Sequence, residues 1–307
     1  MRPPGPFLYR RRVGFGECDA ARIYFAPRAF DYAVEAVEAW FDAELGVPWA
    51  ELPGKRGVEA TILRAECEFL RPLVAGQVVG VRLTVEGCDG TRIRFLAEGG
   101  DGAGEPSIRL RLSLCLASTG SGTPIPLPRE ILARVDAYRV RCVGTDPARE
   151  DPHPPGDRSI PSEGSSPFVR SRRVAYGESG PGGTLYAPKV IEYIIEAIGE
   201  WYEEVPGISW TDLIAKRRQG APWVSAACDF LRPVACGRTV AIGVRVERVG
   251  KSSVGFAVTG FEGGMPCFDA RLTSCFIDRE FRPMPVPEEF RGRIESFHAA
   301  CEAARKR

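Results

Sequence analysis

Histidine is nearly missing from this sequence. The 307 residues include only two, His153 in a proline-rich stretch and His298 near the C-terminus. Ser/His or Cys/His catalytic pairs and histidine metal sites need an imidazole inside a folded unit, so the sequence disfavours both. The ten cysteines contain no Cys-x-x-C pair, and in a chain of this length without an export signal we expect reduced thiols. We therefore predict no metal site.

Long apolar runs and an excess of charge of one sign are also missing. No stretch approaches the roughly 18 apolar residues of a membrane helix, and residues 1–6 lack the apolar core of a signal peptide. Lys and Arg total 41 against 40 Asp and Glu, so no overall field favours nucleic acid or an anionic membrane. The sequence predicts a cytoplasmic protein that binds neither.

What the sequence does contain is an internal repeat. A shift of 161 residues superposes the two halves without a gap from about Val13 to Gly99. A unit of roughly 130 residues is too long for a solenoid repeat, so we interpret the chain as a duplicated domain. Aligned pairs include Phe15-Gly16-Glu17 with Tyr176-Gly177-Glu178, Ala26-Pro27 with Ala187-Pro188, Trp49 with Trp210, and Phe69-Leu70-Arg71-Pro72 with Phe230-Leu231-Arg232-Pro233.

Each half reads as one long helix followed by several strands. Apolar residues after Pro27 recur at three-four spacing, the period of one buried helix face. Residues 63–69 then alternate between apolar and charged, as in a half-buried antiparallel strand. One helix among four or five such strands predicts an α+β fold in which the sheet wraps around the helix. The helix-face residues are Phe30, Ala33, Val34, Val37, Trp40 and Phe41, repeated as Ile191, Ile194, Ile195, Ile198, Trp201 and Tyr202.

A segment rich in Pro, Gly, Ser and charged residues separates the halves. Few apolar residues and many helix and strand breakers are typical of a flexible linker. We predict domains at 8–138 and 169–298, joined by a linker at 139–168. The tail after about Phe297 is expected to be a frayed helix.

Residues 15–27 read Phe-Gly-Glu-Cys-Asp-Ala-Ala-Arg-Ile-Tyr-Phe-Ala-Pro. A strand runs into a short polar loop, and Pro27 suits a first helical position because its missing N–H would have no partner there. A carboxylate just before such a helix lies near exposed N–H groups and the positive end of the helix dipole. Asp19 could therefore be a nucleophile beside an oxyanion stabiliser. The alternative is a solvated turn aspartate before a packed core helix.

This stretch resembles the strand-to-helix signature of hotdog-fold thioesterases of the 4-hydroxybenzoyl-CoA thioesterase type. There the usual run is Phe-Gly-Asp-(Cys/Thr)-Asp-Pro-Ala-Gly-Ile, an aromatic pair, then Pro. The resemblance covers both halves and implies a tandem double hotdog, each unit a long helix wrapped by an antiparallel sheet. It also implies that the units pair edge to edge as an intramolecular pseudo-dimer, and that the protein hydrolyses an acyl thioester, usually of coenzyme A, between them.

Two groups of the first half match functional positions of that family. Asp19 matches the catalytic carboxylate, and the backbone N–H of Ala26 matches the group that polarises the thioester carbonyl. An aspartate of ordinary pKa is ionised at neutral pH, so Asp19 could attack the carbonyl or take a proton from water, and the sequence leaves both routes open. The family's Pro-Ala-Gly becomes Ala20-Ala21-Arg22. Arg22 could pair with Asp19, contact a phosphate or face water.

The second half departs from the signature at the catalytic position. Gly180 stands there, within the run Gly-Pro-Gly-Gly of residues 180–183. Residues 220–225 (Gly-Ala-Pro-Trp-Val-Ser) resemble the Gly-Thr-Pro strand start that the family places opposite the carboxylate, whereas the first half has Glu-Ala-Thr-Ile at 59–62. One half thus supplies the carboxylate and the other the facing wall. We predict one composite active site per chain and a decayed second site.

Four residues could bind the substrate. Tyr24 and Phe25, together with Pro222 and Trp223 of the other half, could line an acyl pocket, and core packing is the alternative for the aromatic side chains. Glu35 is a reserve catalytic candidate because a related thioesterase lineage uses a helix glutamate. Its position opposite the apolar stripe otherwise predicts a solvated side chain.

The predicted function is hydrolysis of an acyl-CoA or acyl-carrier-protein thioester. Coenzyme A or phosphopantetheine would be part of the substrate, with no separate cofactor. One alternative is a catalytically inactive acyl-binding or scaffolding hotdog, consistent with the loss of one carboxylate. Another is a hotdog dehydratase or hydratase, which would rely on a histidine that neither half offers. The acyl group, the thiol carrier and any homo-oligomer stay open.

Overall fold

The first half of the chain forms one long helix in front of an antiparallel sheet. The computed structural model describes residues 5–52, 57–102, 104–119, 122–142, 160 and 162–305. A short 3-10 turn at Phe15–Glu17 and the loop after it join the first strand to the helix. The elements are β1 (Phe7–Arg12), α1 (Arg28–Trp40), β2 (Val58–Phe69), β3 (Val78–Cys88), β4 (Arg92–Gly100), β5 (Ile108–Ser118), β6 (Pro124–Ile125) and α2 (Arg129–Arg141).

The second half repeats this order. It again opens with a strand, a 3-10 turn at Tyr176–Glu178 and a long helix, and it ends on a helix as the first half does. Every strand pair in both halves is antiparallel. The elements are β7 (Phe168–Arg173), α3 (Ala187–Glu204), β8 (Trp223–Phe230), β9 (Thr239–Val249), β10 (Ser253–Glu262), β11 (Met265–Cys275) and α4 (Glu288–Arg305).

The two long helices are held by their apolar faces, as their spacing predicts. All twelve predicted helix-face residues are buried. Trp40 and Trp201 are fully buried, and each packs edge-on against an aromatic ring of the sheet, Phe95 at 5.0 Å and Phe256 at 5.1 Å between ring centroids. These contacts are related by the 161-residue shift, so the repeat seen in the sequence is also a repeat of core packing.

The two sheets join into one. Its strand order is β1-β3-β4-β5-β2-β8-β11-β10-β9-β7, with β6 paired to β5. Between the units β2 pairs with β8, and Arg64 lies opposite Asp229 while Glu68 lies opposite Ser225. The 161-residue shift exchanges these two pairs, which places a pseudo-two-fold axis at the Glu66–Ala227 pair. An isologous pairing of this kind leaves neither inner sheet edge open.

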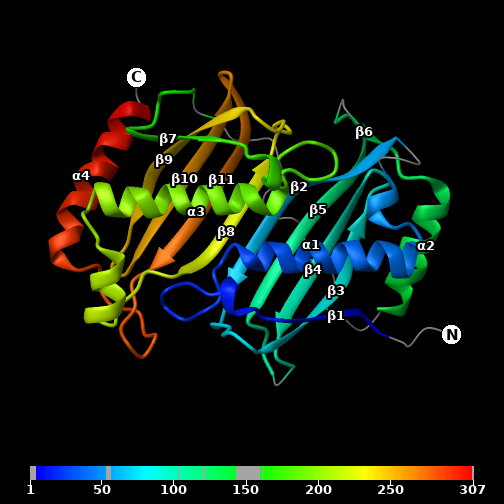
Figure 1. The fold of residues 1–307 in the computed structure, drawn as a ribbon, viewed down its shortest axis with the longest axis horizontal. Helices are drawn as coiled ribbons and strands as arrows, with labels where there is room; N and C mark the ends of the chain where they lie inside the picture. Colours follow the sequence, from blue (N-terminus) through cyan, green and yellow to red (C-terminus); the bar gives the residue numbers. More distant parts are fainter. Residues whose placement is uncertain are drawn as a thin grey trace.

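Both long helices cover the same face of the continuous sheet (Figure 1). Their N-terminal ends point toward the middle of the molecule, where α1 and α3 contact each other, and their C-terminal ends point outward. The dark-blue loop before α1 extends toward the second unit, and the green loop before α3 extends toward the first (Figure 1). Each loop that precedes a helix therefore lies near the junction of the two units.

This architecture confirms the predicted α+β tandem double hotdog, each unit a long helix wrapped by an antiparallel sheet. Two details were wrong. Helix α2 runs to Arg141, into the segment predicted as linker, and α4 continues as a helix to Arg305 with Cys301 buried against the sheet rather than fraying after Phe297. Residues 143–159 and 161 of the predicted linker lie outside the described residues. Among the described helices none is both long and apolar enough to cross a membrane.

Candidate active site

Asp19 sits in a tight turn between β1 and α1. Its Oδ1 accepts a 2.9 Å hydrogen bond from the Ala21 N–H, and its carbonyl accepts another of 2.9 Å from the Arg22 N–H. The residue is exposed to solvent. Protein atoms still displace water around the carboxyl group and raise the pKa of Asp19 above its ordinary value, against the opposing effect of the N–H groups of Ala21 and Ile23. The pKa of Asp19 thus lies above the ordinary value assumed from the sequence, which makes its carboxylate a stronger base.

A second carboxylate, Glu17, holds this loop in place. Its Oε2 accepts hydrogen bonds of 2.7 Å from the Gly14 N–H and from the Tyr32 hydroxyl, and its other oxygen pairs with Arg11. Glu178 makes the equivalent contacts in the second half, with the Ala175 N–H, the Tyr193 hydroxyl and Arg172. Because both halves keep this glutamate and only one keeps the aspartate, Glu17 is a loop anchor. Sequence reasoning missed this role, although the aligned Phe-Gly-Glu and Tyr-Gly-Glu runs carried the signal.

The start of α1 offers a free backbone donor. Helix α1 begins at Arg28, with Pro27 immediately before it, one residue later than predicted. The Phe25 N–H donates to the Glu17 carbonyl at 2.8 Å, whereas no acceptor for the Ala26 N–H is found among the described residues. Such a donor at a helix N-terminus favours an anion or a developing oxyanion.

The two aromatic residues before Ala26 differ in exposure. Tyr24 is only 7% exposed and its ring lies 5.3 Å from that of Tyr32, so it is a core residue, as the alternative interpretation had it. Its hydroxyl has no hydrogen-bond partner in the described part of the chain. Phe25 is half-buried and packs on the same core. Of the two, Phe25 is the better placed to meet a bound acyl chain.

The predicted facing wall lies at the start of β8. Pro222 and Trp223 are both half-buried, and the Trp223 ring packs on Phe256 with 6.0 Å between centroids. In the pseudo-symmetric arrangement the loop of the second unit touches the strand start of the first, because a Cβ on Gly182 would collide with Oε2 of Glu59. The 161-residue shift relates Gly182 to Ala21 and Glu59 to Gly220, so the Asp19 loop and the Gly220–Trp223 segment are the counterparts of this contact. The atoms nearest a Cβ on Gly220 belong to Pro222 and Ile277, so the contact itself is not repeated there.

Glu35 is only partly solvated, with 32% of its side chain exposed. It forms an ion pair with Arg11 and accepts a 3.0 Å hydrogen bond from the Tyr9 hydroxyl. Its counterpart Glu196 pairs with Arg172. The sequence pattern could not show this, because the partners come from β1, a separate segment. A glutamate that forms the equivalent ion pair in both units contributes to the fold, and nothing in these contacts favours a catalytic role for Glu35.

Arg22 has a strained backbone. Its φ is 64°, and the aligned residue of the second half is Gly183 with a φ of 76°. Arg22 is exposed and forms no ion pair with any described residue, Asp19 included. Of the three expectations for Arg22, an ion pair with Asp19 is therefore wrong.

The φ of Arg22 leads to a prediction about stability. Glycine adopts the left-handed region without steric cost, so Arg22→Gly should raise the free energy of unfolding by about 0.5–1 kcal/mol. Arg218, exposed with a φ of 53°, provides the matched control, and Arg218→Gly should show a similar gain. Urea denaturation of the two variants measures both effects. A loss of stability in Arg22→Gly alone would show that its side chain has a partner in the native state.

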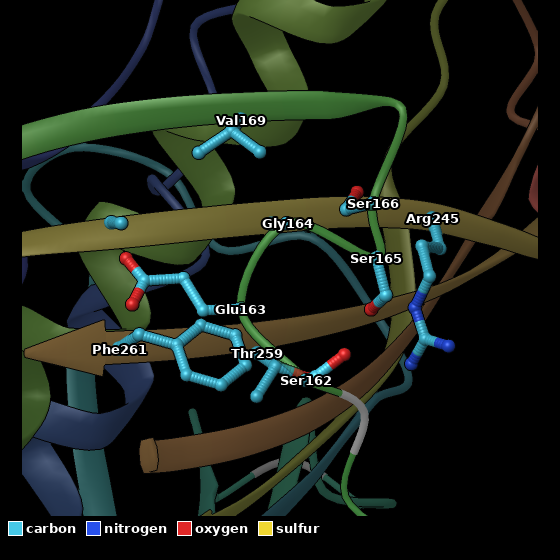
Figure 2. Close-up of a pocket in the computed structure, with 11 residues that line it drawn as sticks. Ser162, Glu163, Gly164, Ser165, Ser166, Val169, Arg245, Thr259 and Phe261 are labelled. Atoms are coloured by element: carbon cyan, nitrogen blue, oxygen red, sulfur yellow. The ribbon is translucent and has the colours of Figure 1, made fainter. Parts of the chain in front are cut away.

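A small pocket lies elsewhere in the second unit. Figure 2 shows residues 162–166 crossing the sheet, with Arg245 at one end of the pocket and Glu163 and Phe261 at the other. Its volume is about 10 Å³, which is room for about one water molecule. This pocket is too small for an acyl group and contains none of the residues discussed above.

The described residues contain no group of three His, Cys, Asp or Glu side chains that could hold a metal ion.

Comparison with known proteins shows what the two halves of the chain are similar to. Residues 13–135 match the family model of the Thioesterase-like superfamily, and residues 182–266 match that of the Thioesterase superfamily. Each half therefore matches a model of the thioesterase superfamily, in agreement with its hotdog fold. A curated protein from Aquifex aeolicus (strain VF5), named "Putative esterase", is 38% identical to this chain over 81 residues. The aligned region covers 26% of this chain and 62% of that protein. The match thus spans less than two thirds of the relative's length.

Solved structures resemble the double hotdog over nearly its whole length. A structure described as "oleoyl thioesterase (putative)" from Lactobacillus plantarum has a TM-score of 0.71 at 14% identity and covers 92% of this chain and 98% of its own. The 12:0-ACP thioesterase from Umbellularia californica has a TM-score of 0.70 at 13% identity, covering 90% and 94%. At these identities the likeness shows the fold, and it extends to both hotdogs together.

Proposed function

We propose that this protein hydrolyses acyl thioesters of coenzyme A or of an acyl carrier protein at one main site between its two hotdogs. Thioester hydrolysis in general is supported by the two superfamily matches. Two observations carry the finer proposal: the Asp19 carboxylate lies in the loop before α1, and the Ala26 N–H at the start of that helix has no acceptor among the described residues. The second unit has glycine in place of Asp19, so the chemistry falls to the first unit, with the carboxylate position of the 4-hydroxybenzoyl-CoA thioesterase type.

The mechanism follows from what each group can do. The thioester carbonyl oxygen lies at the Ala26 N–H, where a preorganised donor stabilises the oxyanion that forms on attack. Asp19 attacks the carbonyl carbon directly, or it removes a proton from the water that attacks. Its raised pKa favours the proton-transfer route, because a base with a pKa closer to neutral takes a proton more readily.

The acyl group is proposed to lie against the second unit. Pro222 and Trp223 at the start of β8 form one wall, and Phe25 forms the other, with Tyr24 packed behind it. A site shared between the two units in this way explains why neither unit alone keeps both the carboxylate and the Gly-Ala-Pro-Trp segment. The 12:0-ACP thioesterase that shares the double-hotdog fold supports testing carrier-protein thioesters beside those of coenzyme A.

A thiol-release assay tests the proposal directly. Aryl, short-chain and long-chain acyl-CoA substrates, and the same acyl groups on an acyl carrier protein, are compared with the intact chain. Release of free thiol that is linear in enzyme and specific for an acyl class supports the proposal. Binding of these substrates without thiol release would instead identify an inactive acyl-binding hotdog.

Changing Trp223 should alter the choice of acyl group. Trp223→Phe keeps an aromatic ring against Phe256, but the smaller side chain leaves more room in the acyl site. The ratio of kcat/KM values for long and short acyl groups should therefore change about 10-fold, which is the scale of the effect of one or two methylenes. Trp210→Phe is the matched control, since Trp210 is also half-buried and packs on one ring, Tyr202, at 5.3 Å. Equal ratios in the two variants would contradict the proposed wall.

A further inference from the structure

The two pseudo-symmetric sites between the units differ in which side carries a carboxylate. In the first, the loop supplies Asp19, and the facing strand start has Gly220. In the second, the loop has Gly180 and Gly182, and the facing strand start has Glu59. The 161-residue shift relates Glu59 to Gly220 and Gly182 to Ala21. At the aligned positions Asp19/Gly180 and Gly220/Glu59, carboxylate and glycine have therefore changed sides, and each site contains one carboxylate.

The exchange of carboxylate and glycine between loop and strand start is accompanied by a direct contact between Gly182 and Glu59. A Cβ on Gly182 would collide with Oε2 of Glu59, so the absence of a side chain on the loop is what lets the carboxylate approach it. Gly182 occupies the position of Ala21, whose N–H holds the carboxylate of Asp19 at 2.9 Å. Glu59 thus brings its carboxylate to the part of the second loop where the first loop keeps its own.

The surroundings of Glu59 leave its carboxylate available. The side chain is half-buried and forms no hydrogen bond or ion pair with any described residue. Burial also raises the pKa of Glu59 above its ordinary value, as it does for Asp19. The donor that corresponds to Ala26 is present too, because the Ala187 N–H at the start of α3 has no acceptor among the described residues.

We propose that Glu59 is the general base of a second, slower thioester-hydrolysing site, formed by β2 of the first unit and the Gly180–Gly183 loop of the second. This proposal rests on the proposed function, since it uses the pseudo-two-fold mate of that site. The loop here carries no charge of its own, and the carboxylate comes from the opposite wall. The sequence predicts a decayed second site, whereas on this proposal the second site is altered only in its source of carboxylate.

The reaction at this site needs no other reactant than water. Glu59 takes one proton from a water molecule while the water oxygen bonds to the thioester carbonyl carbon, giving a tetrahedral oxyanion beside the Ala187 N–H. The carbon–sulfur bond then breaks as the carbonyl re-forms. The proton on Glu59 passes to the departing sulfur, so the products are one acid and one thiol, and Glu59 regains its charge.

Two measurements on the full chain test the second site. The first is calorimetric titration with a non-hydrolysable thioether analogue of the best acyl-CoA substrate. It should give two ligands per native chain and one in Gly182→Leu, which fills the space beside Glu59. The second is hydrolysis by Asp19→Asn, whose residual rate should fall a further 10-fold or more in Asp19→Asn/Glu59→Gln. Glu105→Gln, at an exposed loop glutamate, is the matched control and should leave that residual rate unchanged.

The outcomes separate the two proposals. A native chain that hydrolyses no thioester overturns the proposed function and the second site together. An active native chain whose Asp19→Asn and Asp19→Asn/Glu59→Gln variants have equal residual rates overturns the second site alone. A calorimetric stoichiometry of one analogue per chain in both the native protein and Gly182→Leu would also overturn the second site alone. This measurement does not depend on turnover.

Discussion

Asp19→Asn is expected to lower kcat/KM for thioester hydrolysis by about 100-fold or more while the protein stays folded. Loss of a positioned base or nucleophile costs about 10²–10⁴-fold in rate. Asparagine can still accept the hydrogen bond from the Ala21 N–H, which is 2.9 Å long in the native protein, so the loop should keep its shape. Thiol-release kinetics on the native and variant chains measure the loss, and the part that remains is the share assigned above to Glu59.

A second aspartate provides a matched control for this variant. Asp89 accepts a 3.0 Å hydrogen bond from the N–H two residues on, that of Thr91, just as Asp19 does from Ala21. It lies in the turn between β3 and β4, and Asp89→Asn should leave kcat/KM unchanged. Equal losses in the two variants would show that turn geometry matters and that the Asp19 carboxylate is not the reacting group.

The two aspartates should also differ in their dependence on pH. Displacement of water raises the pKa of Asp19, so the native state binds its proton more tightly than the unfolded state. The stability that this proton contributes is present below the unfolded pKa and lost as pH rises through the folded pKa. Asp19→Asn should therefore be at least as stable as the native protein at neutral pH. Activity should fall on acidification, beginning at a higher pH than an ordinary aspartate would give.

The pKa of Asp89 is shifted in the opposite direction to that of Asp19. Hydrogen bonds from Arg92 and Thr91 outweigh the cost of burial and lower the pKa of Asp89 below its ordinary value. Its charged form therefore stabilises the fold above the unfolded pKa, and this contribution is lost as pH falls through the folded pKa. Asp89→Asn should be less stable than the native protein at neutral pH, and the two stabilities should converge in acid.

The fold could be predicted because its signals are local and repeated. The three-four spacing from Phe30 to Phe41 marked a buried helix face, and its recurrence from Ile191 to Tyr202 marked a second unit of the same kind. The ends of elements were harder. Helix α4 continues past Phe297 because Cys301 is buried against the sheet of its own unit, a contact between distant segments that the spacing of apolar residues does not reveal.

The candidate site was only partly predictable for the same reason. Asp19 and Ala26 lie on one short segment, so the signature pointed to both. Glu35 pairs with Arg11 and Tyr9 across a separate strand, and Glu59 meets Gly182 across the junction of the units. Which carboxylates are anchored and which are available depends on these long-range contacts, and a single sequence does not state them.

Arg64→Ala is expected to lower the free energy of unfolding by about 2–4 kcal/mol, because it leaves carboxylates unpaired at the junction of the two hotdogs. Arg64 is only 8% exposed and lies on β2 directly opposite Asp229 of β8. Its Nη1 donates to Asp229 at 2.5 Å, and its Nε donates to Glu66 at 2.8 Å. Without the guanidinium, the carboxylates of Glu66 and Asp229 both lose this partner at the junction of the units.

Arg109 is the matched control, because it also bridges two carboxylates but lies within one unit and is more exposed. It contacts Glu68 and Glu98, each at 3.1 Å, with 32% of its side chain exposed. Arg109→Ala should therefore cost no more than about 1 kcal/mol. Urea denaturation measures both variants, and the double variant Arg64→Ala/Asp229→Ala should recover part of the loss by removing one unpaired charge.

Activity in Arg64→Ala separates a structural role at the junction from a role in the reaction. Because the proposed site takes Asp19 from one unit and Trp223 from the other, weakening the β2–β8 pairing should reduce activity only as the fraction of folded, paired protein falls with temperature or urea. At low temperature, where nearly all molecules are folded, kcat/KM should stay within about twofold of the native value. A large loss of stability with full activity persisting after the second unit has unfolded would show that the first hotdog carries out the reaction without its partner.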